Sequence, residues 1–338
     1  MKPTRIIFPA VIFLTLLAVI LIVVACGGEE TTTTSLSVQT TESLPTPTVA
    51  GTIAFTNHVG KDDNDICVVN TDGTGLTTIA GGDGIQMHPC WSPDGSRILY
   101  TEEGSRVDFP SMDVWVVNAD GSGRKELYDG PNRDGWATWS PDGTQIAWTG
   151  WTKLHNIGTG QNERAAVFVM DADGSNPHSI TSEEGAGIDY WPMWATDGKI
   201  YFYRWAEPAT PSRAFRVNPD GSGLEELRTI GNNQIDFLPF VVSPDGTKVA
   251  FQDIATAPDR LVIIPASGAG DPVTLLDPVS GYLRGQKAHA SWSPDGKALA
   301  IAGLDMDFTR LFIVNADGTG LSVVPGIEKA SDPAWRPQ

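Results

Sequence analysis

A five-residue motif, Trp-Ser-Pro-Asp-Gly, recurs along the chain and constrains its fold more than any other feature. The motif is intact at Trp91, Trp139 and Trp292, and degenerate copies begin at Trp194 (WATDG) and Val242 (VSPDG). The aspartates of these five copies are 48, 55, 48 and 50 residues apart. Self-similarity at a period of about 20 to 50 residues is typical of solenoids and propellers. The chain is therefore predicted to repeat one structural unit.

A second motif lies between these copies, in which a β-branched and aromatic stretch runs into an Asp-Gly turn, as in DVWVVNADGSG. Asp-Gly favours a tight hairpin, and Ser-Pro-Asp-Gly favours a type I turn in which proline presets φ. Each unit is thus predicted to hold four short strands. The six copies of the second motif begin at Asp65, Asp113, Phe168, Phe215, Ile263 and Phe312.

Six four-stranded units predict an all-β fold, a six-bladed β-propeller of four-stranded antiparallel blades that spans residues 50–338. The closing segment DPAWRPQ places Trp335 where other units carry the motif tryptophan, whereas Gly51 opens directly on a second strand, GTIAFTN. We therefore expect the N- and C-terminal strands to pair and close the ring. This pairing also removes two exposed sheet edges.

The N-terminal region predicts export. Residues 1–25 join a short basic start to an apolar run, which is typical of a signal peptide. The following VVAC resembles a bacterial lipobox, which would make Cys26 the lipid-modified first residue; an uncleaved membrane anchor is the alternative. Residues 26–49, rich in Thr, Ser and Pro, predict a disordered linker. We expect an exported protein anchored by Cys26 to the outer side of a bacterial membrane.

Charge limits the classes of partner, and cysteine content limits the disulfides and metal sites that the chain can form. A formal net charge of −18 excludes nucleic acid, which requires a basic face. Three cysteines are too few for a disulfide framework, and their spacing matches no zinc site. Cys67 and Cys90 are predicted to lie in neighbouring blades, where they form either a disulfide or separate thiols, with Cys67 buried. We expect a monomer without a cofactor.

The combination of WSPDG, a strand and VNADGSG resembles the TolB-like β-propeller repeat over nearly all of residues 51–338. The resemblance implies the propeller fold but does not fix the activity, because that superfamily includes binding, scaffolding and enzymatic members. The chain is also similar to the propeller that shields prolyl-oligopeptidase-type hydrolases. It carries no G-x-S-x-G nucleophile motif, however.

Alignment of the innermost strands on the motif tryptophan predicts the lining of the central channel. The residues three positions before that tryptophan are, for blades one to six, Asp332, His88, Trp136, Trp191, Pro239 and His289. Nearer the mouth of the channel come Asp134, Asp189, Tyr190, Asp236 and Lys287. These residues predict an acidic, aromatic funnel for a cationic or amphipathic segment, or for a sugar stacked on Trp136 and Trp191. The alternative is that both tryptophans pack between blades.

We predict a protein that binds or scaffolds a protein or peptide partner through its variable loop face and funnel, without catalysis. Two alternatives remain open. One is a metal-dependent lyase or hydrolase acting on carbohydrate, with His88, His289 and Asp332 as the ligands. The other is an extracytoplasmic solute-sensing module. The NADGSG turns imitate the start of a calcium loop but lack its closing glutamate, and we interpret them as hairpin turns.

Overall fold

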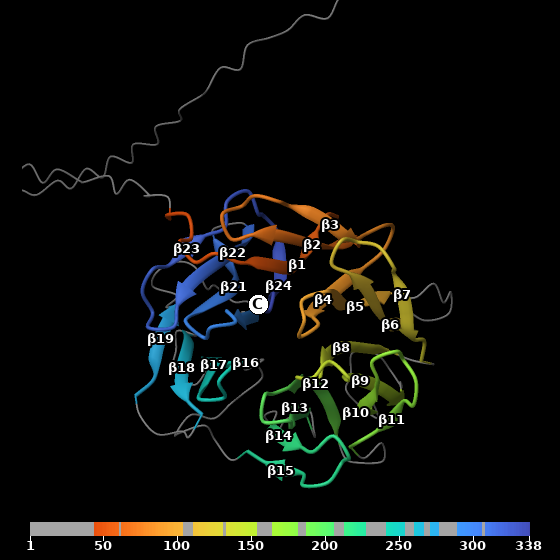
Figure 1. The fold of residues 1–338 in the computed structure, drawn as a ribbon. Coiled ribbons are helices and arrows are strands. Elements are labelled where there is room, and N and C mark those ends of the chain that lie inside the picture. Colours follow the sequence, from red (N-terminus) through yellow and green to blue (C-terminus); the bar gives the residue numbers. More distant parts are fainter. Residues whose placement is uncertain are drawn as a thin grey trace, which may run out of the picture. The chain divides into compact units, whose positions relative to one another are not determined.

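The computed structural model describes residues 44–60, 62–103, 111–130, 133–153, 164–181, 187–205, 213–227, 241–253, 260–266, 271–276, 289–305 and 308–338. These residues belong to one compact unit and form six groups of four strands around a central axis (Figure 1). The predicted all-β propeller with antiparallel four-stranded blades is confirmed.

Within each blade the strands follow one another from the axis outward. The innermost strands are β24 (Ala330–Trp335), β4 (Gln86–Trp91), β8 (Asp134–Trp139), β12 (Ile188–Trp194), β16 (Val241–Val242) and β20 (His289–Trp292). The second strands are β1 (Thr52–His58), β5 (Arg97–Glu103), β9 (Gln145–Lys153), β13 (Ile200–Trp205), β17 (Lys248–Asp253) and β21 (Ala298–Asp305). The third strands are β2 (Asn64–Asn70), β6 (Met112–Asn118), β10 (Arg164–Asp171), β14 (Arg213–Val217), β18 (Arg260–Pro265) and β22 (Phe308–Asn315). The outermost strands are β3 (Thr77–Ala80), β7 (Lys125–Tyr128), β11 (His178–Ser179), β15 (Glu225–Glu226), β19 (Val273–Leu276) and β23 (Ser322–Val323).

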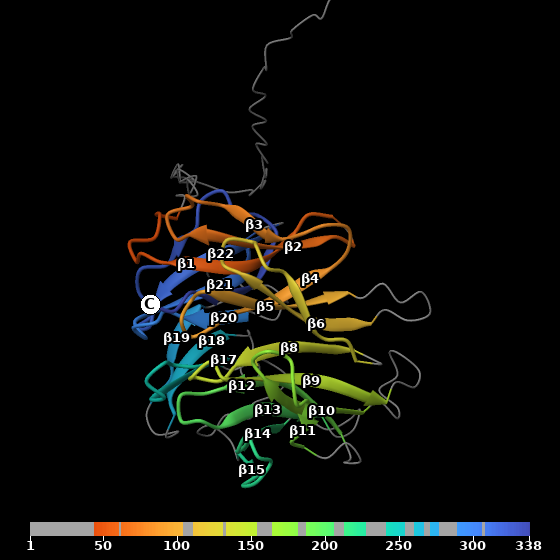
Figure 2. The same ribbon diagram turned by 45° about the vertical axis from the view of Figure 1, so that its right-hand side comes forward.

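The two ends of the propeller meet in blade one. Strand β24 pairs with β1 in antiparallel register, with Ile53 opposite Trp335. The expected closure of the ring is confirmed, and Figure 1 shows β24 beside β1. Figure 2 views the same blades after a rotation. One further contact joins blades three and four, where β10 and β12 pair in parallel at Ala165 and Ile188.

The core of the propeller lies between blades. Each of six clusters of buried apolar side chains combines residues of two neighbouring blades. Between blades one and two, for example, Ile66 packs with Trp91 and Ile98. The Trp91 indole also donates a hydrogen bond to the carbonyl of Ala334 at 3.1 Å. The expectation that motif tryptophans join neighbouring blades is confirmed at this position.

The Ser-Pro-Asp-Gly segments form turns that hold themselves in shape. The amide of Gly95 donates to the carbonyl of Ser92, which closes the turn, and the Asp94 carboxylate accepts from the hydroxyl of Ser92 and the amide of Ser96. These hydrogen bonds lower the pKa of Asp94 to about 2. Equivalent bonds recur around Asp142 and Asp245.

At the described Asp-Gly turns of the second motif, the glycine packs closely against the outer edge of the preceding blade. Asp120 accepts hydrogen bonds from the amide and hydroxyl of Ser122, which supports the interpretation of this motif as a hairpin turn. Gly174, at the same place in blade three, has φ of +94°, and a Cβ there would lie 2.7 Å from the carbonyl oxygen of Leu127. Only glycine tolerates both the backbone angle and this close approach.

The predicted signal peptide and Cys26 lie outside the described residues. Among the described residues, no helix has the length and apolar character needed to cross a membrane. The last residues of the predicted linker contact blade six, since the Val323 amide donates to the carbonyl of Pro45 and Val49 packs on the apolar cluster between blades six and one.

Replacing Trp335 by alanine should destabilise the propeller by about 3 to 5 kcal/mol, since Trp335 is buried at the pairing that closes the ring. Urea unfolding followed by far-ultraviolet circular dichroism measures this effect. Leu76→Ala is the control, because Leu76 is 52% exposed and its truncation should change the stability little. An equally small effect of Trp335→Ala would contradict the role given to the closing strand.

Candidate functional site

Four of the innermost strands contain a residue with left-handed backbone. The φ angles are 56° at His88, 53° at Trp136, 56° at Trp191 and 50° at Asp332. The pairing of each strand with its neighbour shifts register there, as expected for a β-bulge. Such angles are uncommon for residues other than glycine and strain the backbone. The same four residues were predicted from the sequence to line the channel.

A threonine on the preceding blade fixes three of these bulges. Thr56, Thr101 and Thr149 are fully buried, and their hydroxyl oxygens accept hydrogen bonds from the backbone amides of the bulged residues that follow. The distances are 3.3 Å to His88, 3.3 Å to Trp136 and 3.1 Å to Trp191. These threonines were not predicted as site residues, although each ends the same short pattern in GTIAFT, RILYT and QIAWT.

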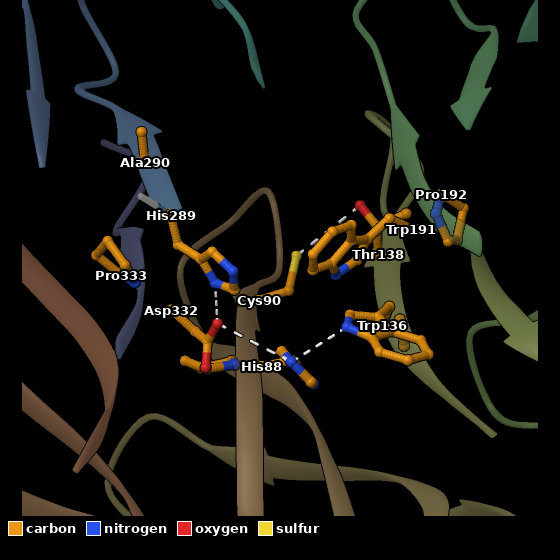
Figure 3. Close-up of a pocket in the computed structure, with 12 residues that line it drawn as sticks. His88, Cys90, Trp136, Thr138, Trp191, Pro192, His289, Ala290, Asp332 and Pro333 are labelled. Atoms are coloured by element: carbon orange, nitrogen blue, oxygen red, sulfur yellow. Dashed lines mark hydrogen bonds and ion pairs between the residues drawn. The ribbon is translucent and has the colours of Figure 1, made fainter. Parts of the chain in front are cut away.

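The channel-facing side chains form a closed belt of contacts. The ring centroids of His88 and Trp136 lie 5.2 Å apart, those of Trp136 and Trp191 5.9 Å, and those of Trp191 and His289 5.5 Å. Asp332 completes the belt between His289 and His88 (Figure 3). We call these five residues the channel belt. Trp191 of blade four thus contacts His289 of blade six directly. Pro239, the equivalent residue of blade five, lies outside the described residues.

Asp332 is the charged centre of the belt. Its carboxylate accepts hydrogen bonds from His289 Nδ1, from the Ser331 hydroxyl at 2.8 Å and from the Thr56 hydroxyl at 3.0 Å. Burial alone raises the pKa of Asp332, but the attraction of His289 and His88 and the hydrogen bonds outweigh it, so this pKa lies well below its usual range. The carboxylate holds the proton of His289 on Nδ1, an arrangement by which proteins orient a histidine as a base or an acceptor.

Whereas Asp332 is held in its charged form, the surroundings of His88 favour its uncharged form. Burial lowers its pKa more than the nearby Asp332 raises it, which favours the neutral imidazole. The Trp136 indole N–H donates to His88 Nε2 at 3.1 Å, so the remaining proton of the neutral ring is on Nδ1. That Nδ1 atom is buried and has no hydrogen-bond partner among the described residues.

A cavity of about 190 Å³ opens beside the channel belt. Besides the belt itself, its walls are formed by residues that follow the belt positions toward the motif tryptophan, among them Pro89, Pro192, Pro333 and Ala290 (Figure 3). The innermost strands run from the belt toward the Ser-Pro-Asp-Gly turns. This cavity, the turn-side cavity, therefore lies on the opposite side of the belt from the predicted funnel mouth.

Two of the predicted mouth residues are buried and hydrogen-bonded. Asp189 is 2% exposed and is bound through two hydrogen bonds by Arg204, whose guanidinium lies 4.7 Å from the ring centre of Phe215. Asp134 is 4% exposed and accepts a hydrogen bond from the Trp148 indole at 3.0 Å. A buried carboxylate is costly without such partners. Both residues therefore stabilise blades rather than supply accessible negative charge.

The remaining predicted site residues are placed as follows. The Tyr190 ring lies tilted beside those of Trp191 and Tyr203, with ring centroids 5.7 and 5.8 Å away. Asp236 and Lys287, and most of the long variable loops, lie outside the described residues. The predicted role of the loop face thus stays a prediction.

The three candidate metal ligands adopt a hydrogen-bonded arrangement. Asp332 Oδ1 contacts His289 Nδ1 and lies 3.9 Å from His88 Nε2, which already accepts from Trp136. A different set of three potential metal-ligand groups, whose ligand atoms lie within 4.8 Å of one another, is found in blade two. It consists of Asp113 on β6, Glu126 on β7 and Asp129 just after β7.

Both predicted thiols are free in the structure. Cys67 is buried between blades one and six, and Cys90 packs against the core between blades two and three. Burial raises the pKa of each thiol, which favours the unreactive protonated form. This arrangement corresponds to the separate thiols rather than to the disulfide.

Comparison with known proteins supports the fold alone. The sequence matches no known protein-family model and no curated protein. TolB from Acinetobacter baumannii is similar in structure, with a TM-score of 0.66 at 18% identity over 85% of this chain and 67% of that one. A chain of a nidogen/laminin complex aligns with a TM-score of 0.58 at 9% identity, over 85% of this chain and 98% of that one. Oligogalacturonate lyase in complex with manganese aligns with 0.52 at 10% identity, over 76% and 72% of the two chains. The chain thus has a TolB-like propeller fold, and its structural neighbours include both binding proteins and enzymes.

Replacing Thr149 by valine should destabilise the protein by about 1 to 3 kcal/mol, because the amide of Trp191 loses its acceptor inside the bulge. Thermal unfolding and the fluorescence of the channel tryptophans measure the change. Thr152→Val on the same strand is the matched control, since the Thr152 hydroxyl is buried without a partner and its removal should be neutral or stabilising. Equal effects of the two substitutions would contradict the role of Thr149.

Proposed function

We propose that this chain is a surface-anchored binding propeller that captures a cationic or amphipathic segment of a protein partner in its turn-side cavity. In this proposal the chain is exported and held at the outer side of a bacterial membrane through lipidated Cys26. The protein acts as a docking platform and does not transform its partner.

The observation that carries the proposal is the charge on the face where the cavity opens. In a four-stranded antiparallel blade, both motif turns connect strands on the same face. Every described turn of either motif contributes an exposed aspartate to that face, and the overall charge of −18 has the same sign. The ten aspartates are Asp72, Asp94, Asp120, Asp142, Asp173, Asp197, Asp220, Asp245, Asp295 and Asp317. A ring of like charges around a central cavity attracts a cationic partner and speeds its approach.

The walls and volume of the turn-side cavity indicate which ligand side chain it would hold. Prolines and the indoles of Trp136 and Trp191 make most of the wall apolar, while Asp332 and His289 provide polar groups at its base. A volume of about 190 Å³ suits one side chain, given that a cavity of roughly 150 Å³ holds a benzene molecule. The proposed ligand therefore places one aromatic, leucine or proline side chain in the cavity and flanks it with lysine or arginine.

Selection of a random-peptide display library on the purified protein tests the cavity. We expect enrichment of sequences with an apolar residue flanked by basic ones, and at least tenfold weaker binding of these peptides to the Trp136→Ala/Trp191→Ala variant. Ala290→Leu, which adds bulk to the cavity wall and retains both indoles, should weaken binding similarly. Trp205→Ala, which alters a tryptophan outside the cavity, is the control. Unchanged affinity in both cavity variants would refute the proposal.

The charged face predicts a distinct pH and salt response. Hydrogen bonds hold the pKa of Asp94, Asp142 and Asp245 at about 2, so these carboxylates stay ionised at pH 3 to 4, where an ordinary aspartate becomes neutral. Binding of the selected basic peptides should therefore persist to about pH 3 and weaken with added salt. In the Asp94→Asn/Asp142→Asn/Asp245→Asn variant, association should slow and its salt dependence should decrease. Association rates from surface plasmon resonance measure both effects, and a salt-independent rate in the unmodified protein contradicts the proposal.

A further inference from the structure

A second cavity lies on the other side of the channel belt, between blades two and three. It has a volume of about 200 Å³ and is separated from the turn-side cavity by His88 and Trp136, which line both. Its walls include Met87, Met112 and Trp151. We call it the loop-side cavity, because Met87, Asp134 and Gly135 in its wall precede the belt residues on the innermost strands.

Three of the side chains that line this cavity carry a buried N–H group without an acceptor. The atoms are His88 Nδ1, Arg133 Nε and Trp151 Nε1, and none has a hydrogen-bond partner among the described residues. Buried polar groups in native proteins are nearly always paired, so each such group calls for an explanation. Three donors of this kind around one cavity indicate that an acceptor belongs inside it.

The donor character of His88 follows from its neighbour. Because the Trp136 indole donates to Nε2, that nitrogen presents its lone pair, and the neutral ring carries its proton on Nδ1. The imidazole is thus held in the one tautomer that offers an N–H at the unpaired atom. Arg133 and Trp151 offer donors only, whatever their state.

The unpaired donors, one of them on a cation, favour an anionic acceptor. No described residue forms an ion pair with Arg133, whose guanidinium is permanently cationic. The carboxylate in the wall, Asp134, accepts a hydrogen bond from the Trp148 indole outside the set of three donors. The rest of the wall consists largely of methionine and indole surface, which favours an apolar body next to the anionic group.

We propose that the loop-side cavity binds a small carboxylate with an apolar body, whose oxygens accept hydrogen bonds from His88, Arg133 and Trp151. The carboxylate meets the guanidinium, and the body packs against Met87, Met112 and the indoles. This ligand site goes beyond the capture of a protein segment, and it lies on the other side of the belt from the turn-side cavity, with which it shares only His88 and Trp136.

Phenylacetate is a suitable probe, because its ring is of the size that such a cavity accommodates. Calorimetric titration of the full chain should give saturable one-to-one binding, and the ¹⁵N-labelled indole N–H signal of Trp151 should shift. The uncharged analogue phenylacetamide should bind at least tenfold more weakly. Arg133→Gln should remove this preference for the anion, and Trp151→Phe should weaken phenylacetate binding several-fold while keeping an aromatic wall.

Two controls separate this proposal from the previous one. Arg213→Gln removes an arginine that is 56% exposed and distant in the chain, and it should leave phenylacetate binding unchanged. Ala290→Leu blocks only the turn-side cavity, so it should abolish peptide capture but preserve phenylacetate binding. Absence of phenylacetate binding, equal affinity for the amide, or indifference to both Arg133→Gln and Trp151→Phe would each overturn the proposal.

Discussion

The pairing of β24 with β1 is the interaction on which the whole molecule depends. Each apolar cluster is shared by two neighbouring blades, so no blade buries its own faces without both neighbours. An open row of six blades would expose two such faces as well as two strand edges. Closure through Ile53 and Trp335 removes both problems at once, because it adds the missing inner strand of blade one from the far end of the chain.

Closure also sets the geometry of the site. Once six innermost strands are fixed around one axis, side chains at equivalent positions converge, and a bulge can turn them inward. The left-handed backbone at His88, Trp136 and Trp191 is strained, and the buried threonine hydroxyls offset part of this strain by pairing the bulged amides. The strained backbone angles occur at the positions whose large side chains extend across the channel. The resulting belt has a different cavity on each side, one toward the turns and one between blades two and three.

Much of this architecture could be predicted from the sequence, because its determinants are local. Turn chemistry in Ser-Pro-Asp-Gly and Asn-Ala-Asp-Gly depends on neighbouring residues, and the spacing of the copies sets the blade count. The channel positions also followed from alignment of the repeats, and the structure brings His88, Trp136, Trp191, His289 and Asp332 together around one cavity. The contact of Trp191 with His289 was not predictable, since it depends on how far each side chain reaches across the ring.

The location of the negative charge shows most clearly what a repeat alignment leaves out. Alignment places Asp134 and Asp189 near the channel, but it does not reveal that Trp148 and Arg204 lie within hydrogen-bonding distance of them. Desolvation makes an unpaired carboxylate costly at such a position, so the fold pairs those it buries. The turn aspartates face no such penalty, because solvent and the turn amides stabilise their charge together. The turn aspartates are therefore exposed, whereas Asp134, Asp189 and Asp332 are hydrogen-bonded near the channel. In the proposed function, the turn aspartates attract a basic partner over a distance, and the largely apolar turn-side cavity provides the contact at short range.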